Sequence, residues 1–164
     1  MAVDFAGIAG VLADAGVEVI VIGGLAAQAH GSARLTQDAD FVYRRTPENI
    51  ERLAAALHAY RPYLRGAPPG LPFVFDSDTI RRGLNFTLTS TLGDADFLGE
   101  IVGGGSYDQL LPHTQTLPVF GRDLKVIDLP ALFRAKRAAG RPKDLEAIAE
   151  LEALLAERER PRGG

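Results

Sequence analysis

A run of β-branched residues near the N-terminus constrains the fold more than any other feature of this chain. The run is Val-Glu-Val-Ile-Val-Ile, residues 17–22, and it is typical of a buried strand. Gly23 and Gly24 end it, and the Ala-rich segment 25–30 that follows is typical of a helix. The sequence therefore predicts a buried strand, a tight glycine turn and a helix in immediate succession.

Helical and extended patterns alternate along the rest of the chain. Thr46 is the expected N-cap of a helix over 47–60, because Pro47 suits a first helical position and an apolar stripe follows. Segment 61–72 is too rich in Pro and Gly for a regular element. The other expected helices cover 3–14, 130–140 and 142–158, and the other expected strands cover 36–43, 84–90, its hairpin partner 95–103, and a strand or hairpin around Gly121.

The composition excludes several classes of protein. The chain has 164 residues with 46% hydrophobic residues, which is typical of one globular domain or of a domain with a helical appendage. A net charge of −3 gives no general basic field for nucleic acid, and the lack of cysteine excludes thiolate metal sites and disulfides. The apolar runs are too short for a membrane span, and Asp4 stands where a signal peptide would be basic. We therefore expect a cytoplasmic protein with no membrane partner.

The tetrapeptide Asp-Ala-Asp-Phe occurs twice, beginning at Asp38 and at Asp94. Alternate residues of a strand share a face and lie roughly 6–7 Å apart, so Asp38 and Asp40 can converge on one cation, joined by an acid from a neighbouring strand. Oxygen ligands favour Mg²⁺ or Mn²⁺. An isolated pair of this kind is more often a solvated edge or turn. Asp94 and Asp96 also share a face, so alternation alone does not choose between them.

The glycines add a second indication. A strand followed by two glycines and a helix lets backbone N–H groups approach a phosphate closely. Gly23 and Gly24 alone are weak evidence, because any tight turn needs glycine. Followed by an Asp-x-Asp pair on the next expected strand, they are more specific.

These motifs resemble the signature of the polymerase-beta-type nucleotidyltransferase superfamily. The resemblance is strongest to its abortive-infection toxin-like (AbiEii-type) branch, which combines Gly-Gly-x-Ala, His-Gly, Arg-x-Thr and Asp-x-Asp, here within residues 23–40. It resumes at segment 94–104 and in the helical tail 132–151, and leaves the middle loop unmatched. Leu25 stands where many members of the wider superfamily have serine, although the toxin-like branch commonly lacks that serine.

The resemblance implies an α/β fold of the α+β type, with a small, mixed, mostly antiparallel sheet flanked by helices. We expect a core domain over residues 1–128 and a C-terminal helical extension over 129–164 packed on it. Asp38 and Asp40 would hold two metal ions about 3.5–4 Å apart. Asp96, deeper in its strand, is expected to be the third acid, as a ligand and as the base or its metal anchor, and Asp94 a turn residue.

The implied reaction is Mg²⁺- or Mn²⁺-dependent transfer of a nucleoside monophosphate from an NTP to an acceptor hydroxyl. The acceptor could be tRNA or another RNA, and the protein could be a toxin with a cognate antitoxin. A catalytically silent nucleotide- or metal-binding module that acts through a protein partner is the alternative. The expected nucleotide-binding residues are Gly23, Gly24, Arg34, Lys136 and Lys143.

Each of the basic residues also has an ordinary structural interpretation. Arg34 could be a solvated loop residue or the partner of an acid, and Lys136 and Lys143 could be solvated helix residues. His30 is expected to pack or cap rather than react. Strand parity turns Phe41 and Tyr43 away from the acids, so we expect them in the core. Asn85 and Tyr107 are possible nucleotide contacts that no pattern singles out.

Overall fold

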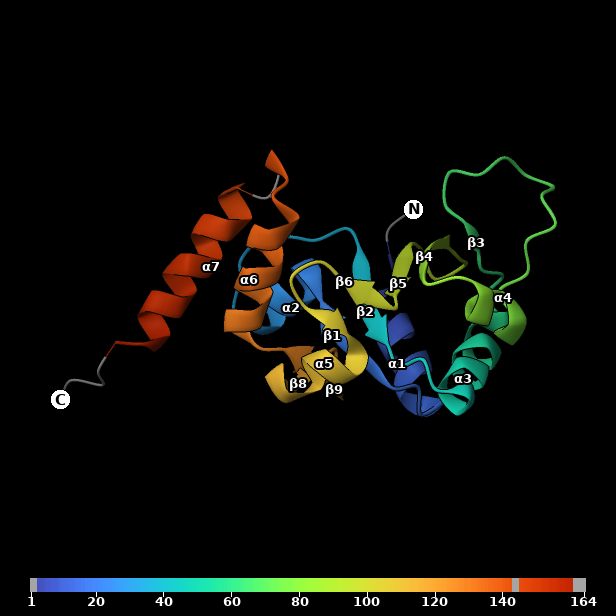
Figure 1. The fold of residues 1–164 in the computed structure, drawn as a ribbon, viewed down its shortest axis with the longest axis horizontal. Coiled ribbons are helices and arrows are strands. Elements are labelled where there is room, and N and C mark those ends of the chain that lie inside the picture. The colour runs from blue at the N-terminus through green and yellow to red at the C-terminus, as the bar shows by residue number, and fades with distance from the viewer. Residues whose placement is uncertain (1–2, 143–144, 161–164) are drawn as a thin grey trace.

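The computed structural model describes residues 3–142 and 145–160, in which helices flank one large sheet (Figure 1). The helices are α1 (Phe5–Asp14), α2 (Gly23–Ala29), α3 (Pro47–His58), α4 (Ser77–Arg82), α5 (Tyr107–Leu110), the 3₁₀ turn η1 (Leu111–His113), α6 (Leu129–Ala139) and α7 (Leu145–Arg158). The strands are β1 (Val19–Ile22), β2 (Ala39–Tyr43), β3 (Tyr63–Leu64), β4 (Asn85–Thr89), β5 (Ala95–Leu98), β6 (Glu100–Ile101), β7 (Gly105–Ser106), β8 (Thr114–Val119) and β9 (Arg122–Ile127).

The main sheet has seven strands in the order β3-β4-β5-β2-β1-β9-β8. The β2–β5 and β1–β9 pairs are parallel, and the other four pairs are antiparallel. The sheet is therefore mixed and mostly antiparallel, as expected. Strand β1 lies inside the sheet between β2 and β9 and is buried along its whole length, which explains the β-branched run in its sequence.

Strands β2 and β5 contribute aromatic side chains to the core. Phe41, Tyr43 and Phe97 are fully buried, and the rings of Phe41 and Phe97 stack with centroids 5.4 Å apart. The Tyr43 hydroxyl donates to the Leu84 carbonyl at 2.8 Å, which satisfies its one polar group. The expectation that Phe41 and Tyr43 are core residues is confirmed, and the alternating residues Asp40 and Asp96 are left on the opposite side of their strands.

The helices divide the molecule into two ends with the sheet between them. In Figure 1, α6 and α7 lie together at one end, while α3, α4 and the long loop after β3 lie at the other. Helix α2 packs against β1, β2, β9 and α6, so it joins the sheet to the C-terminal helices. None of the helices in the described parts of the chain combines the length and apolarity needed to cross a membrane.

Helix α3 begins as the sequence predicts, and α6 has clearly formed ends. Thr46 caps α3 by accepting a hydrogen bond from the Asn49 backbone at 3.3 Å, with Pro47 in the first turn. Asp128 caps α6, and Gly140 ends it in the left-handed conformation. The predicted core domain ends where α6 begins, and the division into core and extension stays a prediction.

Three segments differ from the sequence expectation. Strand β2 begins at Ala39, so Asp38 lies before it. The Thr36 hydroxyl accepts a hydrogen bond from the Asp38 backbone N–H and donates one to the Asp38 carbonyl, and these bonds form a local turn in place of strand pairing. The strand expected over 95–103 ends at Leu98. The Gly99 N–H donates to the Asn85 side-chain oxygen at 2.9 Å and to the Leu84 carbonyl at 3.0 Å, and β6 pairs with β7 instead.

The third difference is in the middle loop. Residues 63–64 form the short edge strand β3, paired with β4, although the sequence around them predicts only a loop. Pro and Gly exclude a long strand there, but they leave room for two residues of edge pairing. Helices α4 and α5 were also not predicted, since six and four residues are too short to show helical periodicity.

Candidate active site

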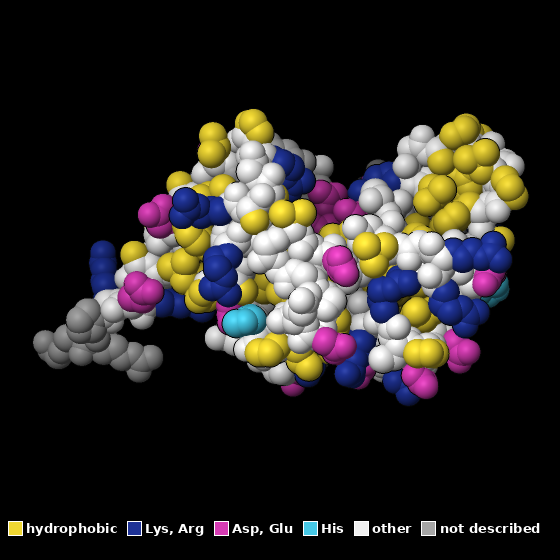
Figure 2. All heavy atoms as spheres, viewed as in Figure 1, with side chains coloured by type: hydrophobic (Ala, Val, Ile, Leu, Met, Phe, Trp, Pro, Cys, Tyr) yellow, Lys and Arg dark blue, Asp and Glu magenta, His cyan; other side chains and the backbone are white. Residues whose placement is uncertain are grey.

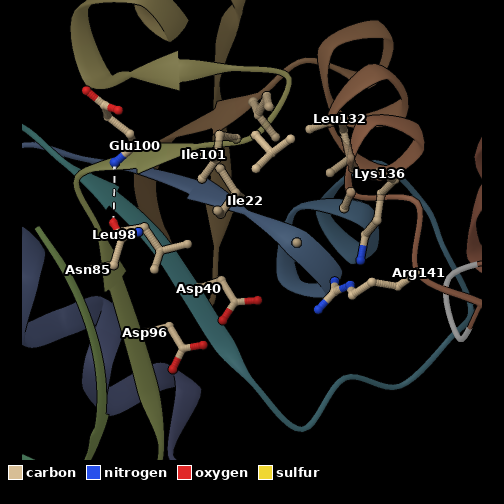
Figure 3. A pocket seen from close by; sticks show the side chains of 15 residues that line it. Ile22, Asp40, Asn85, Asp96, Leu98, Glu100, Ile101, Leu132, Lys136 and Arg141 are labelled. Atoms are coloured by element: carbon tan, nitrogen blue, oxygen red, sulfur yellow. Dashed lines mark hydrogen bonds between the residues drawn. The ribbon is translucent and has the colours of Figure 1, made fainter.

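Two carboxylates from neighbouring strands lie at the centre of the candidate site. Strands β2 and β5 run parallel, and Asp40 is the direct register partner of Asp96. Figure 3 shows both carboxylates projecting from their strands into the same cavity. The parallel pairing thus brings together one acid from each copy of Asp-Ala-Asp-Phe.

Asp40 is held in an environment that disfavours its charge. Its Oδ1 atom is buried and makes no hydrogen bond within the described residues. Burial, followed by the nearby negative charges of Asp96 and Asp38 and a hydrogen bond with Asp96, raises the pKa of Asp40 from 3.8 to about 7. Such a carboxylate needs either a proton or a cation to balance it near neutral pH.

The two glycines are the first two residues of α2, where the sequence predicted a turn before the helix, and they let the chain bend close to Asp40. Gly23 has a φ of +65°, and a Cβ atom there would lie 2.6 Å from Asp40 Oδ2. A Cβ atom on Gly24 would lie 2.6 Å from the Thr36 hydroxyl oxygen, in the turn that precedes Asp38. Both positions therefore need glycine for close packing at the acids, whether or not their N–H groups also contact a phosphate.

Asp38 is the most exposed of the three acids. It is exposed and lies outside β2, yet its charge contributes to the raised pKa of Asp40. Asp38, Asp40 and Asp96 all line one polar hollow. Within residues 3–142 and 145–160, however, no group of three or more Asp, Glu, His or Cys side chains is arranged closely enough to hold a metal ion. The structure thus brings Asp40 and Asp96 together and leaves Asp38 at the margin.

Arg65 is a site residue that sequence reasoning missed. It follows β3, and its Nη2 atom donates to Asp96 Oδ1 at 2.7 Å, while its Nε atom lies 3.3 Å from Asp94 Oδ2. Asp94 thus forms an ion pair in addition to its expected place at a turn. Nothing in the Pro- and Gly-rich loop around Arg65 distinguishes it, because the contact depends on the edge pairing of β3.

Basic groups face the acids from the C-terminal helices. In Figure 3, the Lys136 ammonium group on α6 and the Arg141 guanidinium group just after α6 point toward the carboxylates of Asp40 and Asp96. The positive charge of Lys136 lowers the pKa of Asp40 and so partly offsets the acids. Arg141 was not among the expected site residues, although it lies in the tail motif of the resemblance. Lys143 lies outside the described residues.

Arg34 lines the same polar hollow as the acids and also pairs with an acid of α7. Its Nη1 atom lies 3.2 Å from Glu146 Oε2, and both side chains are substantially exposed. This contact matches the structural interpretation of Arg34 as the partner of an acid. It leaves open a role toward phosphate, since an exposed ion pair of this kind contributes only about 0.2–1 kcal/mol.

Two cavities meet at the acid pair. The first has a volume of about 310 Å³ and lies between β2, β5 and α6, with a largely apolar wall that includes Ile22, Leu98 and Leu132. The second, about 450 Å³, lies against the 31–38 loop and α7 and has mostly polar lining. Figure 2 shows acidic side chains recessed between the end that carries α6 and the end that carries the loop after β3, with basic side chains beside them. Asp40, Asp96, Lys136 and Arg141 line both cavities.

The donor set suits a hard divalent cation. The carboxylates of Asp40 and Asp96 supply oxygen ligands, and the unbonded, buried Oδ1 atom of Asp40 is the kind of atom that a cation would satisfy. No cysteine is present in the chain, and His30 is committed elsewhere, because its Nε2 atom lies 2.7 Å from the Ile127 carbonyl oxygen. These residues therefore fit Mg²⁺ or Mn²⁺ better than zinc.

The other residues considered in the sequence analysis lie outside the site or at its edge. His30 caps the C-terminal end of α2 and is buried, and burial lowers its pKa, in keeping with a packing role. Asn85 lines the apolar cavity, where its side chain also fixes the turn after β5. Tyr107 is buried beside Arg44 in a separate small cavity, so it does not reach the acids.

The comparison with solved structures identifies the fold. A crystal structure from Thermotoga maritima, described as a "putative nucleotidyltransferase" (TM1012), resembles this chain with a TM-score of 0.52 and 13% sequence identity, over 87% of this chain and 86% of that one. No protein-family model matches the chain, and no curated protein matches it. The protein therefore has a nucleotidyltransferase-like fold, in agreement with the superfamily resemblance of its motifs. The toxin-like branch stays a prediction.

Proposed function

We propose that the protein is a nucleotidyltransferase that moves a nucleoside monophosphate from an NTP to an acceptor hydroxyl with Mg²⁺ or Mn²⁺ and releases pyrophosphate. The observation that carries the proposal is the register pairing of Asp40 with Asp96 beside an unbonded buried oxygen, opposite the basic groups of Lys136 and Arg141. Opposed acidic and basic groups across one cavity suit a triphosphate with its counter-ion. The fold of the Thermotoga maritima protein supports the same class of activity.

Each part of the site has a distinct task in this proposal. Asp40 and Asp96, with Asp38 at the margin, would hold the divalent cation, which supplies charge neutralisation at the reacting phosphate. Lys136 and Arg141 bind phosphate oxygens by charge-assisted hydrogen bonds. The apolar wall of the smaller cavity accommodates the nucleoside, because bases and riboses bind well against hydrocarbon surfaces. The polar hollow against the 31–38 loop admits the acceptor and brings its hydroxyl to the acids.

A transfer assay tests the proposal. Purified protein is incubated with each labelled NTP, Mg²⁺ and hydroxyl acceptors that include RNA and protein, and label transfer is compared with that of Asp38→Asn and Asp40→Asn. Asp78→Asn is the matched control, since Asp78 is an exposed acid paired with Arg81 and Arg82 on α4. We expect transfer by the wild type and the control, with a loss of at least about a hundredfold in Asp40→Asn. Transfer that survives both site substitutions would refute the assignment.

One observation favours a second candidate function. The three acids do not form a complete metal-ligand group in the described residues, and Asp96 is engaged by Arg65. A nucleotide-binding module without turnover, acting through a protein partner, would have such a site. It is the better account if the protein binds NTP with Mg²⁺ but consumes none with any acceptor.

The acceptor and the physiological role are further parts of the proposal, and they rest on the family resemblance alone. RNA is one acceptor class, and transfer to RNA by a toxin with a cognate antitoxin is one physiological role. Expression in bacteria separates these roles: growth arrest that Asp38→Asn abolishes indicates a toxin, and unaffected growth indicates a different role.

A further inference from the structure

The second Asp-Ala-Asp-Phe copy carries a feature that the proposed reaction does not explain. Asp94 and Asp96 are alternate residues around the start of β5, and both lie against one arginine, Arg65. Only Asp96 is paired with Asp40, so transfer chemistry alone gives no reason for the Asp94 contact. The shared contact with Arg65 therefore indicates a role for Asp94 that is separate from the pairing of Asp96 with Asp40.

Arg65 is fixed by both its backbone and its side chain. Its backbone N–H donates to the Thr87 carbonyl at 3.0 Å, which extends the pairing of β3 with β4. Its Nη2 atom donates to the Leu88 carbonyl at 2.9 Å as well as to Asp96 Oδ1 at 2.7 Å. The side chain is 27% exposed, so solvent does not compete freely for these contacts. The guanidinium group is therefore a rigid anchor for the Asp96 carboxylate.

The charge of Arg65 also balances one side of the acid cluster. Asp40 and Asp96 are register partners on neighbouring strands, and the charges of Asp96 and Asp38 both raise the pKa of Asp40, so these carboxylates repel one another. Arg65 forms an ion pair with Asp94 and donates a hydrogen bond to Oδ1 of Asp96, so a cation shared with Asp40 would bind Asp96 through Oδ2. Because a planar guanidinium group can engage two acids at once and an ammonium group is a point charge, lysine cannot replace both roles.

We propose that Arg65 is a positioning residue that uses Asp94 as its brace, orients Asp96 for the transfer reaction, and limits the affinity of the acid cluster for divalent cations. This inference rests on the proposed function, because it assumes that Asp96 serves a cation site. It assigns Asp94 the role of holding Arg65, not of binding metal.

The test measures Mn²⁺ binding and transfer separately in Arg65→Gln and Arg65→Lys. Loss of the positive charge in Arg65→Gln should tighten Mn²⁺ binding by roughly tenfold, while kcat falls because Asp96 is no longer oriented. Arg65→Lys keeps the charge, so its Mn²⁺ affinity should stay within about twofold of the wild type while kcat still falls. Arg82→Gln is the matched control: it removes the same charge from an arginine that is 80% exposed on α4.

The outcomes separate this inference from the proposed function. Failure of the wild type to bind Mn²⁺, or Mn²⁺ binding that Asp40→Asn leaves unchanged, overturns the cation site and the inference with it. Normal wild-type binding that Arg65→Gln weakens, or changes no more than Arg82→Gln does, overturns the inference alone.

A metal-free double-mutant cycle covers the case in which a variant folds poorly. The unfolding effects of Arg65→Gln and Asp94→Asn should be non-additive, because the two residues are in contact. Strict additivity would show that Asp94 does not brace Arg65 and would overturn the inference.

Discussion

The substitution Gly23→Ala tests whether glycine at the start of α2 is needed for the backbone to lie this close to Asp40. Gly23 has a φ of +65°, a conformation that costs an L-residue about 1–2 kcal/mol. The added Cβ atom would also lie 2.6 Å from Asp40 Oδ2, closer than real Cβ contacts occur. The Asp40 side chain must then leave its rotamer, at a further cost of about 1 kcal/mol. We therefore expect Gly23→Ala to lower the free energy of unfolding by roughly 2–3 kcal/mol.

Gly16→Ala provides the matched control. Gly16 has nearly the same φ, +68°, after the end of α1, and apart from its chain neighbours no atom of the described structure lies within 4 Å of the position its Cβ would take. Its substitution carries the backbone cost without the clash, so the loss should be about 1–2 kcal/mol. Unfolding in urea at one pH measures both variants, and the entropy effect of replacing glycine by alanine is common to both.

The same glycine substitutions made in an Asp40→Ala variant isolate the contribution of the contact with Asp40. In Asp40→Ala the carboxylate is gone, so the extra cost of Gly23→Ala over Gly16→Ala, about 1 kcal/mol, should disappear. NMP transfer should be lost in Gly23→Ala and retained in Gly16→Ala. Equal costs for the two glycine substitutions in the wild-type background, together with no change in Asp40→Ala, would refute the close-approach argument.

Three further predictions concern the acids, the basic groups and the cavity. The pKa of Asp40 is raised to about 7 from 3.8, so the folded state binds this proton more tightly than the unfolded state, and stability should rise as pH falls from about 7 toward 4. Asp40→Asn should flatten this dependence and raise Tm at pH 8 without metal, as measured by thermal unfolding at several pH values. The same change of Tm with pH in Asp40→Asn and in the wild type would contradict this. Lys136→Gln should raise the KM for NTP roughly tenfold, because a phosphate partner is lost, whereas Arg137→Gln on the same helix should not; equal effects in steady-state kinetics would argue against it. Ala135→Leu should fill the apolar cavity and abolish NTP binding by calorimetry while Arg134→Leu does not; undiminished binding would place the nucleoside elsewhere.

The sequence predicts the central part of the fold well because local patterns are strong there. The β-branched run at 17–22 contains the buried strand β1, and the capped, striped segment after Thr46 forms α3, as their patterns predict. The alternation around Phe41 correctly separates core from acid positions. In each case the residues of one segment are sufficient to determine their own structure.

The parts that could not be predicted depend on contacts between distant segments. Arg65 reaches Asp96 across 31 positions through the edge strand β3, which two residues form only because β4 offers a partner. The turn at Asp38 depends on a single hydroxyl, that of Thr36, which competes with strand pairing. The choice of Asp96 over Asp94 came from the family resemblance, and the role of Asp96 as a ligand stays a prediction. Arg141 comes near the acids only because α6 packs beside α2.

A crystal structure with Mn²⁺ and a non-hydrolysable NTP tests the central claim most directly. The account predicts an anomalous Mn²⁺ peak about 2.1 Å from carboxylate oxygens of Asp40 and Asp96, with the triphosphate facing Lys136 and Arg141 and the nucleoside against the apolar wall beside α6. A Mn²⁺ ion that touches neither Asp40 nor Asp96, or a nucleotide bound away from the two cavities that these acids share, would contradict it.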